Sequence, residues 1–192
     1  MGREFELKYR ADAQTLAAIE KTYSGFAPIS METTYYDTPD GALSSRHITL
    51  RRRMENAVSV CTVKTPIGGH GRGEWELECD DIHAAIPQLC KLGATEDLIS
   101  LTASGIVPVC GAKFTRKAKL LKLERCTVEI ALDQGVLLGG NRQLPIQEVE
   151  VELKDGGEEA AVAFAAELAK VYGLTPENRS KFRRAQLLAR GE

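Results

Sequence analysis

Strict alternation of charged and apolar residues in three short segments restricts most strongly how this chain can fold. In a β-strand, successive side chains point to opposite faces, so residues two positions apart share a face. Segments 4–9, 74–79 and 148–153 each place charged residues, mostly glutamate, on one face and apolar residues on the other. A fourth segment places Arg51 and Arg53 together on one face. The pattern predicts antiparallel strands with one charged face and one face packed on a core.

The repetition of one charge sign on each strand indicates what these faces do. An ordinary solvated face explains any single strand, but such faces more often mix Lys, Thr, Gln and Ser. Carboxylates that share one strand face lie ~6.6 Å apart and repel each other. Acid-rich strands beside strands rich in Arg and Lys therefore suggest a polar cavity, in which carboxylates hold divalent cations and basic groups hold a polyanion.

The amphipathic helices indicate which way the charged faces point, because periodicity alone does not distinguish a cavity from bulk solvent. Segments 12–23, 82–92 and 157–172 each carry an apolar stripe that needs a partner. The apolar strand faces are the obvious partner. If the helices cover the outside of a barrel, the charged faces must point into it.

Strands outnumber helices along the chain, and few helices separate successive strands. Further strands are predicted at 31–37, 47–54, 58–65, 112–122, 125–132 and 136–139. Residues 133–135, Asp-Gln-Gly, are predicted to form a hairpin turn, 66–73 a glycine-rich loop, and 178–189 a last basic helix. The predicted fold is one α+β domain over residues 1–192, with a mainly antiparallel sheet of about eight strands that can close into a barrel.

Composition excludes several classes of protein. Hydrophobic residues make up 43% of the chain and charged residues 27%, so there is enough apolar material for a core. No segment approaches the ~18 consecutive apolar residues of a membrane span, and the start of the sequence resembles no signal peptide, so we expect a cytoplasmic protein. A net charge of −2 argues against a nucleic-acid partner. The five cysteines form no CxxC motif, so we expect neither a disulfide scaffold nor a zinc site.

Several motifs, in order from residue 4 to about residue 187, resemble the CYTH superfamily, also called triphosphate tunnel metalloenzymes. Glu4-Phe5-Glu6-Leu7-Lys8 fits the E-x-E-x-K signature of that family. Tyr35-Tyr36-Asp37-Thr38-Pro39-Asp40, followed by Leu50-Arg51-Arg52-Arg53, resembles a second family segment. The late segments are similar too: Glu129-Ile130-Ala131-Leu132-Asp133-Gln134-Gly135, Glu148-Val149-Glu150-Val151-Glu152-Leu153 and Ser180-Lys181.

The resemblance implies a fold and a substrate class. Family members have an antiparallel eight-stranded β-barrel that forms a tunnel, with helices packed on the outside. They act on a linear triphosphate, or on a molecule that carries one, with one or two Mg²⁺ or Mn²⁺ ions. The segment around 129–153 is most similar to the bacterial inorganic triphosphatase branch.

The resemblance also implies roles for individual residues. Its metal-binding carboxylates match Glu4, Glu6, Glu148, Glu150 and Glu152. Its phosphate-binding cations match Lys8, Arg51, Arg53, Lys64, Arg72, Arg116, Lys181 and Arg184, although a surface salt bridge is an equal alternative for Arg184. The expected catalytic set is Glu4, Glu6, Lys8, Glu74 and Glu148, with either Glu74 or Glu148 as the proton acceptor. One departure is Ala118, which stands where the family often has lysine, between Lys117 and Lys119 on the opposite strand face.

The predicted function is metal-dependent hydrolysis of inorganic tripolyphosphate to pyrophosphate and phosphate. The alternatives are an organic triphosphatase acting on thiamine triphosphate or a nucleoside triphosphate, a class IV-type adenylate cyclase, and a non-catalytic polyphosphate-binding module. Acidic pairs argue against the binding module, since a pure anion binder would do better without them. The expected partner is a small-molecule triphosphate, with no nucleic acid or membrane, and the protein is expected to be a monomer or a homodimer.

Overall fold

A single antiparallel sheet dominates the computed structural model, which describes residues 2–66, 72–95 and 97–192. The strands are β1 (Gly2–Glu4), β2 (Glu6–Arg10), β3 (Ala27–Asp37), β4 (Thr49–Glu55), β5 (Val58–Pro66), β6 (Arg72–Glu78), β7 (Val107–Lys122), β8 (Cys126–Gly139), β9 (Arg142–Gly156) and β10 (Thr175–Pro176). The helices are α1 (Ala13–Tyr23), α2 (Ala42–Ser45), α3 (Ile82–Lys91), α4 (Asp97–Leu101), α5 (Glu158–Tyr172) and α6 (Lys181–Arg190). Residues 67–71 of the predicted glycine-rich loop lie outside the described residues. None of the described helices is long and apolar enough to cross a membrane.

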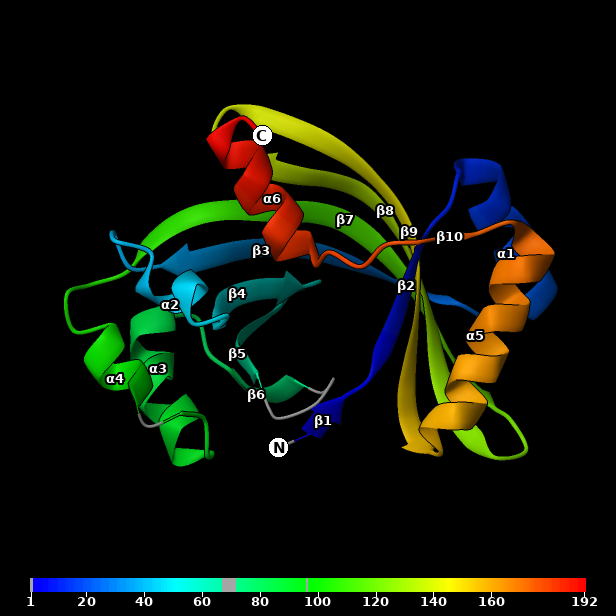
Figure 1. Cartoon of the computed structure of the whole chain (residues 1–192), viewed down its shortest axis with the longest axis horizontal. Coiled ribbons are helices and arrows are strands. Elements are labelled where there is room, and N and C mark those ends of the chain that lie inside the picture. The colour runs from blue at the N-terminus through cyan, green and yellow to red at the C-terminus, as the bar shows by residue number, and fades with distance from the viewer. Residues whose placement is uncertain (1, 67–71, 96) are drawn as a thin grey trace.

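The antiparallel α+β architecture is confirmed, but the closed eight-stranded barrel is wrong. Ten described strands follow the order β1-β6-β5-β4-β3-β7-β8-β9-β2-β10, and hydrogen bonds do not close the sheet. Instead, the chain itself connects the two ends. β1 pairs with β6 and β2 pairs with β9, and only Phe5 separates β1 from β2. The sheet therefore curls into a deep trough whose two sides meet at the start of the chain (Figure 1).

The apolar strand faces lie on the convex side, where most helices cover them. α1 and α5 pack on β2, β8 and β9, with Ile19 and Leu168 against Val149 and Val151. α3 and α4 form a second core on β4, β5 and β6 (Figure 1). These helices bury the apolar residues of each alternating strand, so the charged residues of the same strands face the concave side, as predicted.

The last helix is an exception to the prediction that helices pack on the outside. Ala185 and Leu188 of α6 pack against Met31, Phe114 and Leu137 on the concave face, and Figure 1 shows α6 beneath the arch of β7, β8 and β9. Ser180 caps the helix by accepting a hydrogen bond from the Arg183 backbone. One end of the trough is thus filled by a helix, because the concave strand faces become apolar there.

Glycines in β8 explain both the close approach of α6 and a wrong turn prediction. A Cβ on Gly139 would lie 2.5 Å from the Ala189 nitrogen, so only glycine lets α6 come this near. Asp133-Gln134-Gly135 is not a turn but the middle of β8. A Cβ on Gly135 would lie 2.2 Å from the Lys113 carbonyl oxygen, so this glycine serves close packing against β7.

Candidate active site

A cavity of about 820 Å³ opens on the concave side of the sheet. The predicted site residues that line it are Glu4, Glu6, Lys8, Arg51, Arg53, Lys64, Arg72, Glu74, Arg116, Glu150, Glu152 and Lys181. Two predicted site residues, Glu148 and Arg184, do not line it and are buried behind Lys181. The strand alternation therefore brings residues from both ends of the chain to one volume.

One wall of the cavity, formed by β4, β5 and β6, is rich in cations. Lys64 Nζ lies 2.6 Å from Glu4 Oε2 and 3.3 Å from Glu74 Oε1. Arg51 Nη2 also lies 3.3 Å from Glu74 Oε1, so one carboxylate contacts both cations. Arg72 donates to Thr49 Oγ1 at 3.2 Å. Arg51 and Lys64 of this wall thus share the carboxylate of Glu74, and Arg72 donates to a neutral group.

Arg53 shows that cations near this wall repel one another. Burial lowers the pKa of its guanidinium, and the neighbouring charges of Arg51 and Arg116 lower it further, while Glu55 acts in the opposite direction. A bound polyanion would relieve this repulsion. The cation-rich wall is therefore suited to phosphate oxygens.

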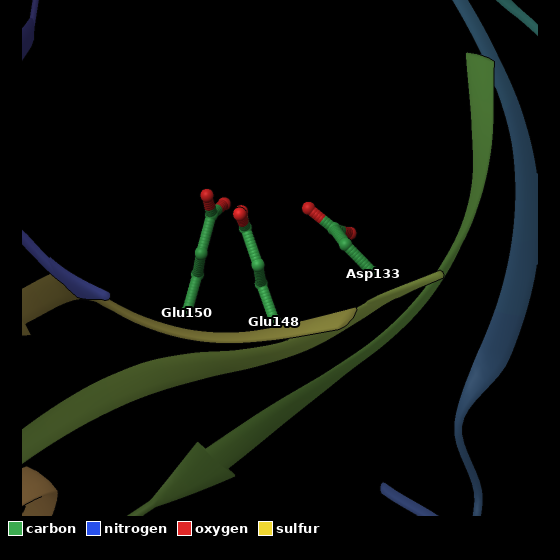
Figure 2. Close-up of side chains that lie close together, drawn as sticks. All are labelled: Asp133, Glu148 and Glu150. Carbon is green, nitrogen blue, oxygen red and sulfur yellow. The ribbon is translucent and has the colours of Figure 1, made fainter. Parts of the chain in front are cut away.

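On the opposite wall, three buried carboxylates form the first of two acidic rows. Asp133 of β8 faces Glu148 of β9 across the strands, and Glu150 follows two residues later on the same face. Their side chains converge (Figure 2), and one oxygen of each lies within 4.8 Å of the others. By spacing alone, the buried row, as we call Asp133, Glu148 and Glu150, could hold a metal ion.

Protein cations already neutralise the buried row. Lys181 Nζ lies 2.7 Å from Asp133, 2.8 Å from Glu148 and 2.6 Å from Glu150. Arg116 donates two hydrogen bonds to Asp133, at 2.8 and 2.7 Å, and contacts Glu150 as well. Burial alone would raise the pKa of Glu150, but Lys181, Arg116 and Lys8 hold it well below its usual range. A metal ion would have to displace these partners.

The second acidic row lies farther from α6 and has fewer cations. Glu6 of β2 faces Glu152 of β9, which in turn faces Glu129 of β8. We call these three residues the open row. Lys154 Nζ contacts it, 2.8 Å from Glu152 and 3.8 Å from Glu129.

The charges of the open row are incompletely balanced. Burial raises the pKa of Glu152, the neighbouring charges of Glu4 and Glu129 raise it further, and Lys154 only partly offsets them. A divalent cation with oxygen ligands would relieve this repulsion. The open row therefore has fewer cationic partners than the buried row, although Lys8 contacts Glu6 and Lys64 contacts Glu4.

Sequence reasoning missed several groups at the site. Asp133 was assigned to the expected turn and not to the site, although it stands four residues after Glu129 and so shares its strand face. Glu76, Glu129 and Lys154 also line the cavity. The same alternation could have identified them. Glu76 and Lys154 each lie two residues from a predicted site residue, and Glu129 lies four residues before Asp133 on the same strand face.

The two lysines beside Ala118 point away from the cavity. Lys117 contacts Glu20 of α1 at 2.7 Å, and Lys119 donates to the Ser24 carbonyl. Ala118 itself lines the cavity. Neither lysine therefore replaces the one that the family often carries at this place.

Comparisons with known proteins agree with the fold. The sequence matches the CYTH domain family over residues 2–185. It is 28% identical to the inorganic triphosphatase of Haemophilus influenzae over 98% of this chain and 55% of that protein. The chain thus spans about half the length of this relative.

Solved structures share the architecture at low identity. A candidate adenylyl cyclase from Hippeastrum, reported to have a dominant triphosphatase activity, superposes with a TM-score of 0.70 at 18% identity, over 100% of this chain and 97% of that one. A protein of Pyrococcus horikoshii OT3 gives 0.66 at 22% identity, over 98% and 99% of the two chains. At these identities the structures support the fold alone.

Proposed function

The chain belongs to the CYTH domain family, and we propose that it hydrolyses inorganic tripolyphosphate to pyrophosphate and phosphate with Mg²⁺ or Mn²⁺. The single observation that carries the proposal is that cations and carboxylates line one cavity together. Arg51, Arg53 and Lys64 line it along with the carboxylates of the open row. Such a cavity can hold a polyanion on one side and its metal ion on the other.

The aromatic side chains of the cavity already contact other protein groups, which favours an inorganic triphosphate over a nucleotide as the substrate. Tyr35 and Phe182 line the cavity but contact each other, with ring centroids 5.1 Å apart. Phe114 lies beneath Lys181 Nζ at 5.2 Å and Arg116 at 5.9 Å. These three are buried, and the fourth aromatic residue of the lining, Phe5, is partly buried against the core under α1 and α5, so they offer little open ring surface on which a base could stack.

For the metal ion, the best-fitting ligands are Glu4, Glu6 and Glu152, with Glu129 as an addition from the structure. Within the buried row, Glu150 lines the cavity, whereas Glu148 does not. When bound, the ion would neutralise phosphate charge and lower the pKa of a coordinated water. Of the metal ligands predicted from sequence, Glu148 has the environment least suited to this role.

The protein's own groups would position the substrate and accept a proton. Lys8, Arg116 and Lys181 on one wall and Arg51, Arg53, Lys64 and Arg72 on the other would hold phosphate oxygens and stabilise the charge of the transition state. Between the two expected proton acceptors we choose Glu74. It lines the cavity within 3.3 Å of Lys64 and Arg51, whereas Glu148 is enclosed by Lys181 and Arg184.

The test is phosphate release from tripolyphosphate, thiamine triphosphate and ATP, each with Mg²⁺, Mn²⁺ or chelator, beside Glu4→Gln. We expect metal-dependent release from tripolyphosphate, fast relative to the organic substrates and abolished in the variant. Preference for an organic triphosphate would replace the substrate but keep the site. Pyrophosphate release from ATP without phosphate release would indicate a cyclase instead. Binding of tripolyphosphate without any turnover would indicate a binding module.

A further inference from the structure

Glu177 joins the beginning of the chain to its end. The residue follows β10, which pairs with β2, and its backbone nitrogen donates to the Lys8 carbonyl at 2.9 Å. Its side chain is buried, and Arg10 Nε donates to Oε2 at 2.8 Å. Oε1 accepts from the backbone nitrogen of Arg179 at 3.0 Å. Glu177 thus fixes the segment that leads into α6 against the strand that carries Lys8.

A chain of buried ion pairs leads from Glu177 to the cavity. Arg184 Nη1 lies 3.9 Å from Glu177 Oε2, and Nη2 of the same guanidinium contacts Glu148 Oε1. The other oxygen of Glu148 lies 2.8 Å from Lys181 Nζ. All four residues are at most 8% exposed, so water screens these interactions little. Only Lys181 of the four lines the cavity.

We propose that Glu177 is a positioning residue: through Arg184 and Glu148 on one side and through β2 on the other, it sets the orientation of Lys181 and Lys8 for phosphate binding. The proposal rests on the proposed function, because the two lysines matter only if a phosphate-bearing substrate occupies the cavity. Glu177 itself does not line the cavity and so does not touch substrate. The interactions also give the buried Glu148 a role that needs no metal ion.

The charge of Glu177 is suited to this role. Burial alone would raise its pKa, but hydrogen bonds from the Arg179 backbone and from Arg10 and Arg179 side chains, with the charge of Arg184, lower it to about 2. The carboxylate is therefore ionised throughout the pH range in which a phosphatase would be assayed. A neutral amide in its place would leave Arg184 with Glu148 alone.

The decisive experiment compares Glu177→Gln with Glu177→Asp and with Leu168→Ala, which weakens the core on the convex face. KM and kcat for tripolyphosphate are measured with saturating Mg²⁺ at a temperature where all variants are folded. Loss of the Glu177–Arg184 ion pair in Glu177→Gln should raise KM about tenfold while kcat changes less than about threefold. Glu177→Asp keeps the charge and should recover KM to within about threefold, and Leu168→Ala should leave KM unchanged.

A second readout needs no substrate. In protein with ¹⁵N-labelled lysine, the Lys181 ammonium signal, assigned through Lys181→Arg, should be protected from hydrogen exchange in the wild type and lose protection in Glu177→Gln. If the wild type hydrolyses no triphosphate, the proposed function fails. Retained protection of Lys181 in Glu177→Gln would then overturn the positioning role of Glu177 as well. Equal increases of KM in Glu177→Gln and Leu168→Ala, or none in either, would overturn the positioning role directly.

Discussion

The buried row and the open row stand on the same face of the same sheet, yet their surroundings differ. Both include alternate glutamates of β9: Glu148 and Glu150 in the buried row, and Glu152 in the open row. α6 lies over the buried row, and Lys181 contacts all three of its carboxylates. The open row has Lys154 as its nearest cation and Glu4 as an additional negative charge.

The difference teaches that one sequence pattern can serve two purposes. Carboxylates that are buried and paired stabilise a structure only while every partner is present. Carboxylates that repel each other at the edge of a cavity bind a cation more favourably, because the cation removes the repulsion. The buried row is therefore expected to affect folding and positioning, and the open row to affect catalysis. Three substitutions test this division.

The largest effect is expected from Glu6→Gln. This change removes one charge from the open row at nearly constant size, so turnover of tripolyphosphate should fall at least ~100-fold while Tm changes little. The matched control is Glu32→Gln, because Glu32 and Glu6 each lie 3.4 Å from a lysine, Lys113 and Lys8 respectively. The control should be as active as the wild type. Near-normal turnover of Glu6→Gln would show that catalysis does not depend on the open row.

Glu148→Gln should act mainly on stability. The change leaves Lys181 and Arg184 with one charged partner fewer in a buried site. The free energy of unfolding should fall by about 3 kcal/mol, which corresponds to a Tm lower by about 10 °C for a chain of this size. Calorimetry would measure both values. Unchanged stability together with lost Mg²⁺-dependent turnover would reverse the comparison and place the metal ion in the buried row.

The smallest effect is expected from Glu152→Gln in metal-free protein. Because the folded-state pKa of Glu152 is raised, its ionised form costs stability at pH values above that pKa. The variant should therefore be more stable than the wild type at pH 7, by about 0.5 kcal/mol after screening at this partly exposed site. The difference should shrink as pH falls toward the ordinary value of 4.5.

Added Mg²⁺ sharpens the same test. Binding to the folded state raises Tm by mass action. Mg²⁺ should raise the Tm of the wild type and raise that of Glu152→Gln much less. A metal-free variant that is less stable than the wild type would show that Lys154 already balances the open row.

Much of the site was accessible from sequence because alternation fixes which residues share a face. The pattern correctly placed Glu4, Glu6 and Lys8 on one face with Leu7 and Tyr9 on the other. The same rule placed Arg51 and Arg53 together on one face, which lines the cavity, and Lys117 on the face opposite Arg116, where it contacts Glu20. These results need only the geometry of an extended strand, which depends little on its neighbours.

Predictions that depended on long-range packing were less successful. The Asp-Gln-Gly segment has turn chemistry, but β7 lies so close that Gly135 is needed inside a strand. The last helix has an apolar stripe like the others, yet it packs on the concave face. Local periodicity cannot show which of two apolar surfaces a helix will cover. Arg184 was expected on the surface or at the substrate, and it lies in neither place.

The sequence by itself determined the strands, the charge of each strand face and the family to which the chain belongs. Only the tertiary structure decided which carboxylates are balanced, because that depends on cations brought from distant positions. Lys181 is 31 residues from Glu150 in sequence and 2.6 Å from it in space. Charge interactions are set by distance and burial rather than by order along the chain, so the structure separates the open row from the buried row where the sequence shows one series of glutamates.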